Sequence, residues 1–256
     1  METEDQESSE FANNVFKNMH ELFFNPEIAK RKEQNLIPDD FTLIAAQALL
    51  FPNGRPHIVR LNNEVSVEVK LKKGVDKEAK DFWPASSEIE YVKLNEEEFL
   101  DCGHVTLILF RDGFQLSFDF SYNKQICAEH LTVAKQFLKT SKFALENDFV
   151  FAFIDNSFSA IELLAKTNLL VEANQNMRRK TSHNTIKAAF NLRYRNSQTQ
   201  FEVSRREMFN RLSDARKAAR YLEGKVTFNR SELETINATI EEMYLELCKR
   251  ADFNDG

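Results

Sequence analysis

One stretch decides how the second half of this chain folds: FVFAFIDNSFSAIELLAKTNLLV, residues 149–171. Its apolar residues are not confined to one stripe but occupy nearly the whole circumference of a helix. A helix of that kind is stable in water only when other helices surround it. The stretch therefore predicts the central helix of a bundle.

Amphipathic helices are predicted on either side of this stretch. The preceding one follows Asn123, and its apolar stripe consists of Ile126, Val133, Phe137, Leu138, Ala144 and Leu145. Further helices are expected over about 183–194, 200–222 and 231–250. Ser182 is a candidate N-cap for the first of these, and Ser231 with Glu234 forms a capping box for the last. Five helices with short connections indicate an antiparallel bundle.

The first half of the chain has strand patterns instead. The segment HVTLILFRDGFQLSFDFS, residues 104–121, contains Asp112-Gly113, a dipeptide that suits a type I′ hairpin turn. That turn predicts one apolar face built from the pairs Leu109–Leu116, Leu107–Phe118 and Val105–Phe120. Other strands are expected at 41–51, 64–71 and 88–94. Together these segments predict a small, mostly antiparallel sheet over 41–121.

A helix is expected to flank this sheet. Residues 11–24 have apolar side chains at spacings of three and four, and Asn25-Pro26 is expected to end that helix before a charged link. Ile108 and Phe110 fall on the face opposite the hairpin core, where either this helix or a protein partner could cover them. The predicted fold class is α+β. An N-terminal α/β region (1–122, with 1–10 a disordered acidic tail) precedes a helical bundle (123–252).

The composition excludes several classes of protein. Of the 256 residues 42% are apolar, which is enough for a core, and only six Gly argue against a Gly-rich nucleotide loop. The three scattered cysteines form no disulfide framework, and the pairs Cys127/His130 and Cys102/His104 lack the further ligands of a zinc site. No signal peptide or membrane-spanning run is found. We therefore expect a cytoplasmic protein that needs no metal or cofactor and does not contact membranes.

Charge is distributed unevenly along the chain. The net charge of −6 combines +9 on residues 178–225, which hold thirteen basic and four acidic residues, with −15 elsewhere. Such asymmetry is typical of proteins with an anionic partner, although a solvated helix face gives the same pattern. Aromatic residues lie among these cations, as in proteins that bind single-stranded RNA: Phe190, Tyr194, Phe201, Phe209 and Tyr221. Several of these phenylalanines also have helical spacing, which is more often typical of core residues.

Four segments of the second half resemble the HEPN domain, a helical module named for nucleotide binding in higher eukaryotes and prokaryotes. They are SFSAIELLAKTNLL (157–170), KTSHNTIKAAFN (180–191), LSDARKAARYLEG (212–224) and VTFNRSELETINATIEEMYLEL (226–247). The third is similar to the family's signature region, in which an Arg is followed four to six residues later by a His. The resemblance covers roughly residues 124–250.

The resemblance implies binding of RNA or a nucleotide by a homodimer formed through the bundle. In catalytic members, Arg and His from two protomers form a metal-independent ribonuclease site that serves defence or stress responses. Here Arg216 occupies the Arg position, but Tyr221 stands where the His is expected. A tyrosine phenol is a poor base at neutral pH, so the signature is degenerate.

A second match to the same spacing runs from Arg178 to His183 and makes His183 an alternative catalytic candidate. The candidate catalytic residues are thus Arg216, Tyr221 and His183. The candidate nucleic-acid-binding residues are Arg178, Arg179, Lys180, Arg193, Arg195 and Arg220. Two functions stay open: an RNA- or nucleotide-binding HEPN protein with ribonuclease activity, or a non-catalytic HEPN scaffold that dimerises and binds other proteins.

Overall fold

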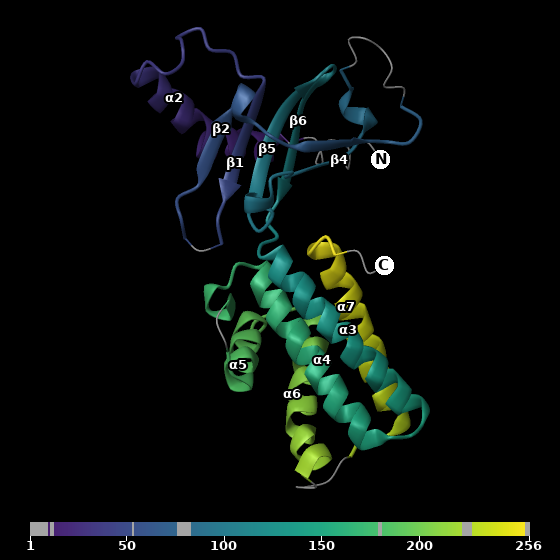
Figure 1. Ribbon diagram of the computed structural model, residues 1–256. Helices are drawn as coiled ribbons and strands as arrows, with labels where there is room; N and C mark the ends of the chain where they lie inside the picture. The colour runs from purple at the N-terminus through teal and green to yellow at the C-terminus, as the bar shows by residue number, and fades with distance from the viewer. Residues whose placement is uncertain are drawn as a thin grey trace. The chain divides into compact units, whose positions relative to one another are not determined.

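The computed structural model describes residues 10, 13–52, 54–75, 83–178, 181–221 and 227–253. The chain divides into two compact units, Met1–Phe120 and Ser121–Gly256. The first contains a small antiparallel sheet and the second is helical, which confirms the predicted α+β class (Figure 1). Apart from Glu10, the expected acidic tail lies outside the described residues.

The first unit contains two antiparallel sheets. The larger has the strand order β2-β1-β5-β6, with bounds Ile58–Leu61, Ala45–Leu50, Gly103–Phe110 and Gly113–Asp119. The smaller pairs β3 (Glu68–Leu71) with β4 (Ile89–Lys93). The prediction of one strand over 64–71 is therefore only partly right, because Asn62–Glu64 form a short 3-10 turn and β3 starts at Glu68. Strand β2 was not predicted.

The β5–β6 hairpin exists, but its predicted register is wrong by two residues. Phe110 pairs with Gly113, Leu107 with Leu116 and Val105 with Phe118. Gly113 takes a φ of +135°, whereas Asp112 is not among the residues with positive φ, so the turn is not a type I′ turn on Asp112-Gly113. A shift of two residues keeps each side chain on its predicted face, because strand side chains alternate with period two.

Helical residues cover one face of the larger sheet. The helix that contains residues 13–19 passes through η1 (His20–Phe24) into α2 (Asn25–Glu33), so the predicted break at Asn25-Pro26 is wrong. Pro26 comes two residues after the π-helical turn η1, where the regular hydrogen-bond ladder of the α-helix is already interrupted. Phe24 of this segment packs against Val105 and Leu107 in the core.

Strand β4 covers the opposite face. Ile108 and Phe110 are buried in a cluster with Ile89 and Val92, and the ring of Trp83 lies 6.1 Å from that of Phe110. Neither of the two occupants expected for this face, the N-terminal helix or a protein partner, is therefore correct for these two side chains.

The second unit is a bundle built around one helix. Helix α4 (Val150–Val171) is the predicted central helix, and Phe153, Ile154, Ile161 and Leu164 on it are fully buried. Figure 1 shows α4 among the other helices: α3 (Lys124–Glu146), α5 (His183–Arg193), α6 (Gln200–Tyr221) and α7 (Arg230–Arg250). These five helices agree with the sequence prediction, and the bundle core is continuous across them.

Two helix starts test the predicted caps. Ser182 caps α5 as predicted, since its hydroxyl accepts a hydrogen bond from the N–H of Thr185 at 3.3 Å. Helix α7 is not capped by Ser231 but by Asn229, whose side chain and that of Glu232 form the capping box. The backbone of Asn229 is extended, as is usual for an N-cap, so the helix begins at Arg230, earlier in the chain than a cap at Ser231 would place it.

One buried histidine makes the stability of the bundle depend on pH. Burial, with a smaller contribution from the charge of Lys166, lowers the pKa of His130 on α3 to about 4. Its Nδ1 is buried and has no hydrogen-bond partner among the described residues. In the unfolded chain the imidazole of His130 binds a proton near pH 6.5. The contribution of His130 to the free energy of unfolding is therefore fully present above that pH. The stabilisation is lost as the pH falls from about 6.5 to about 4.

We expect the His130→Gln variant to lose less stability on acidification than the wild type. The difference between the two should be about 1 kcal/mol, since partial contact with solvent screens the effect. Urea unfolding of both proteins at pH 7.5 and near pH 4.5 measures it. Equal losses in the two proteins would contradict the assignment.

Candidate functional site

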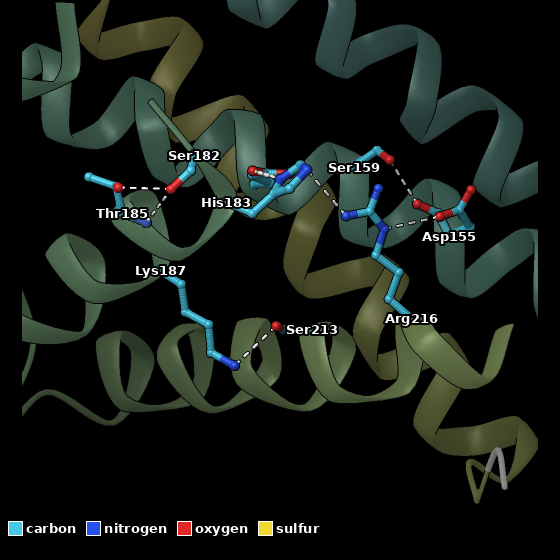
Figure 2. A network of polar contacts seen from close by, with 9 residues as sticks. Asp155, Ser159, Ser182, His183, Thr185, Lys187, Ser213 and Arg216 are labelled. Carbon is cyan, nitrogen blue, oxygen red and sulfur yellow. Dashed lines mark hydrogen bonds and ion pairs between the residues drawn. The ribbon is translucent and has the colours of Figure 1, made fainter. Parts of the chain in front are cut away.

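Three helices of the bundle bring polar side chains to one place. Helix α4 contributes Asp155 and Glu162, the first residue of α5 is His183, and α6 contributes Arg216 and Arg220. Figure 2 shows His183 and Arg216 directed toward each other, with Asp155 on the far side of Arg216. Arg216 and His183 are 33 residues apart in sequence.

His183 is held from its Nδ1 side. The Glu162 carboxylate contacts Nδ1 of the imidazole, and Glu162 itself is 9% exposed. A carboxylate accepts hydrogen bonds, so this contact favours the tautomer with the proton on Nδ1. In that tautomer Nε2 carries a lone pair, which faces Arg216, and the side chain of His183 is 61% exposed.

Arg216 lies next to that nitrogen. Its Nη1 is 3.5 Å from His183 Nε2, and its Nε is 3.3 Å from Asp155 Oδ1. The guanidinium carbon lies 4.5 Å from the ring centroid of Phe158, a buried residue of α4. Cation–π contact and the ion pair together fix the position of the guanidinium.

Arg220, one turn further along α6, shares the same carboxylate. Its Nε is 3.1 Å from Asp155 Oδ1. Residues four apart face the same side of a helix, so Arg216 and Arg220 form a pair of cations over one anion. The site thus combines an oriented imidazole with two guanidinium groups, which is a chemistry suited to phosphates.

The structure does not bring Tyr221 into this site. It is five residues from Arg216, so it is displaced by about 140° around the helix. Tyr221 is 65% exposed and makes no hydrogen bond to the described residues. Of the three candidate catalytic residues, His183 and Arg216 are adjacent and Tyr221 is apart from them.

The predicted nucleic-acid-binding residues have different surroundings. Among those that the structure describes, only Arg220 belongs to the site. Arg193 forms an ion pair with Glu172 at 2.6 Å, while Arg178 and Arg195 are exposed and form no ion pair with the described residues. Arg179 and Lys180 lie outside the described residues.

Much of the positive charge on 178–225 is balanced within the bundle. Acidic residues from other segments pair with it, as in Arg205–Glu246 at 2.8 Å and Arg211–Glu232 at 2.7 Å. The sequence could not show this, because these acids lie far along the chain. The net charge of the segment therefore overstates the positive field at its surface.

Most of the interleaved aromatic residues belong to the core. Phe190, Tyr194 and Phe209 are buried and pack on one another. The guanidinium of Arg205 stacks on Phe201, with its carbon 3.3 Å from the ring centroid. The helical spacing of these phenylalanines indicated core positions, which the structure confirms for Phe190 and Phe209. The three buried rings are unavailable for stacking on bases.

Two residues of the site were missed by sequence reasoning. Asp155 and Glu162 are seven residues apart on α4, a spacing that places both on one face of the helix. Carboxylates on one face of an otherwise apolar central helix are a usable signal, since burying a charge requires a partner.

Residues 127–251 match the family model of the HEPN domain. The second half of the chain is therefore a HEPN domain, as the resemblance implied. No curated protein and no solved structure matches the chain. Among the helices that the structure describes, none has a stretch long and apolar enough to cross a lipid bilayer.

We expect the cap of α5 to control the position of His183, which is the first residue after it. Ser182→Ala removes the acceptor for the Thr185 N–H and should lower the free energy of unfolding by about 1 kcal/mol. Amide exchange at Thr185 should accelerate, and Ser182→Asp should restore both values, because Asp also caps helices. An unchanged rate of amide exchange at Thr185 in Ser182→Ala would show that the cap does not stabilise the first turn of α5.

Proposed function

We propose that the HEPN domain binds RNA and cleaves it at the His183–Arg216 site without a metal ion. The observation that carries the proposal is the contact of Arg216 Nη1 with His183 Nε2 at 3.5 Å, while Glu162 holds Nδ1. The contact supplies, from another helix, the histidine that the signature lacks at Tyr221. Domains of this family commonly bind RNA and dimerise.

The chemistry follows from the geometry. His183 Nε2 takes the proton of a ribose 2′-hydroxyl, and the 2′-oxygen attacks the neighbouring phosphorus. The bond from phosphorus to the 5′-oxygen breaks, and that oxygen takes up a proton from solvent. Arg216 and Arg220 stabilise the charge that develops on the phosphate oxygens. The products are a 2′,3′-cyclic phosphate and a 5′-hydroxyl.

Glu162 acts as a positioning residue in this scheme. Its carboxylate fixes the ring orientation and the tautomer of His183 and stabilises the imidazolium once the proton has been taken up. Asp155 has a different part. It pairs with both Arg216 and Arg220 in the free protein and offsets one of their two positive charges, and a substrate phosphate takes over their hydrogen bonds.

The test is incubation of labelled single-stranded RNA with the full chain in the presence of EDTA. We expect His183→Ala and Arg216→Ala to lower the cleavage rate by about 100-fold or more, and Glu162→Gln by about 10-fold. Lys217→Ala is the matched control, since Lys217 is exposed on the same helix and outside the site. It should cleave as the wild type does.

The substrate offers a second control. RNA with a 2′-deoxy residue at the cleavage position should bind but stay intact, because the attacking oxygen is missing. Binding itself should weaken with increasing salt as phosphate contacts are replaced by counterions. Binding without cleavage would mean that the domain recognises RNA but has no ribonuclease activity. A folded chain that does not bind RNA at low salt would instead favour the non-catalytic scaffold.

The homodimer through the bundle and the role in defence or stress responses remain predictions from the HEPN resemblance. Exposed Leu192 on α5 gives the scaffold alternative some support, because this large apolar side chain is 70% exposed. The RNA assay distinguishes the two functions directly.

A further inference from the structure

Strand β6 (Gly113–Asp119) is an edge of the larger sheet. It pairs with β5 on one side, and no described residue outside β5 forms a backbone hydrogen bond with it. An edge strand presents N–H and C=O groups that can accept another strand. The pairing of β5 with its two neighbours shows which backbone groups of β6 point to this free edge.

The backbone groups of every second residue point outward. The N–H of Leu109 in β5 donates to the carbonyl of Ile44 on the β1 side at 2.8 Å. Backbone direction alternates along a strand, so the even-numbered residues of β5 bond to β6. Their partners are the odd-numbered residues of β6. Phe114, Leu116 and Phe118 therefore direct their N–H and C=O groups to the free edge.

The side chains of the same residues add apolar surface. Phe114 is 40% exposed and Phe118 is 52% exposed, and the ring of Phe118 stacks on that of Phe120 at 5.5 Å. The strand GFQLSFD contains no Lys, Arg or Pro, and its one charged residue, Asp119, is at its end. Charged residues, proline and short length are the features that keep edges from pairing.

The opposite edge of the sheet has those features. Strand β2 (Ile58–Leu61) is only four residues long, and Pro56 precedes it. Its Arg60 forms an ion pair with Glu96 at 2.8 Å. One edge of the sheet is thus protected from association and the other is not.

We propose that β6 is a self-association edge, which pairs antiparallel with β6 of a second copy of this chain. A two-fold axis at Leu116 places Leu116 opposite its counterpart and Phe114 opposite Phe118 of the second copy. Every outward N–H and C=O of these three residues then has a partner. The aromatic side chains fall on the same face and pair across the strands. This self-complementarity identifies the occupant as a second copy, in keeping with the isologous contacts of two-fold dimers.

The test uses two charge patterns on the full chain. Phe114→Lys/Phe118→Lys puts like charges directly opposite each other at both ends of the paired strands, and it should halve the molar mass measured by sedimentation equilibrium. Phe114→Glu/Phe118→Lys puts opposite charges in the same places, and it should keep the wild-type mass with increased sensitivity to salt. Phe143→Lys, at an exposed aromatic residue on α3, is the matched control and should keep the wild-type mass. Circular dichroism verifies that each variant is folded.

Three outcomes would overturn the proposal. A wild-type chain that is monomeric over the whole concentration series has no such contact. A Lys/Lys variant that keeps the molar mass of the wild type shows that the assembly is formed elsewhere, for example through the bundle. Equal dissociation of the Lys/Lys and Glu/Lys variants shows that the stated register is wrong. RNA cleavage is independent of each of these results, since the site lies on other elements.

Discussion

The burial of helix α4 is the constraint on which the helical unit depends. Its fully buried side chains, such as Ile161 and Leu164, make it the surface on which the other helices pack. A charged residue in such a helix must find a partner from a neighbour, because an unpaired buried charge is costly. Glu162 meets this requirement through His183, and Asp155 through two arginines of α6. The packing of α5 and α6 on α4 therefore also assembles the site.

The sequence predicted most of the fold because its patterns are local. Helical periodicity located the helices of the bundle, and alternation located the β5–β6 hairpin. The errors arose where a longer-range contact overrides a local signal. Asp112-Gly113 suits one turn type, yet the strand pairing places Phe110 opposite Gly113. Pro26 was read as a helix end, but the helical run continues past it, with the π-helical turn η1 directly before Asn25-Pro26.

The site could be predicted only in part, for a related reason. His183 and Arg216 were both recognised as candidates, each within its own short motif. Their contact joins residues 33 positions apart and depends on how α5 and α6 pack on α4. No spacing rule within a single helix contains that information. The net charge of the basic segment overstated its positive surface for the same reason. The acids that pair with it belong to distant segments, such as that of Glu246.

The carboxylate of Asp155 between Arg216 and Arg220 has a consequence for selectivity. With this internal anion in place, the two cations attract a passing polyanion less than their number suggests. Under the proposed function, a substrate phosphate binds there by ligand exchange, in which one oxyanion replaces another at the same hydrogen-bond donors. Only an anion that fits both guanidinium groups at once would gain from the exchange. Such a site would discriminate by geometry rather than by overall charge.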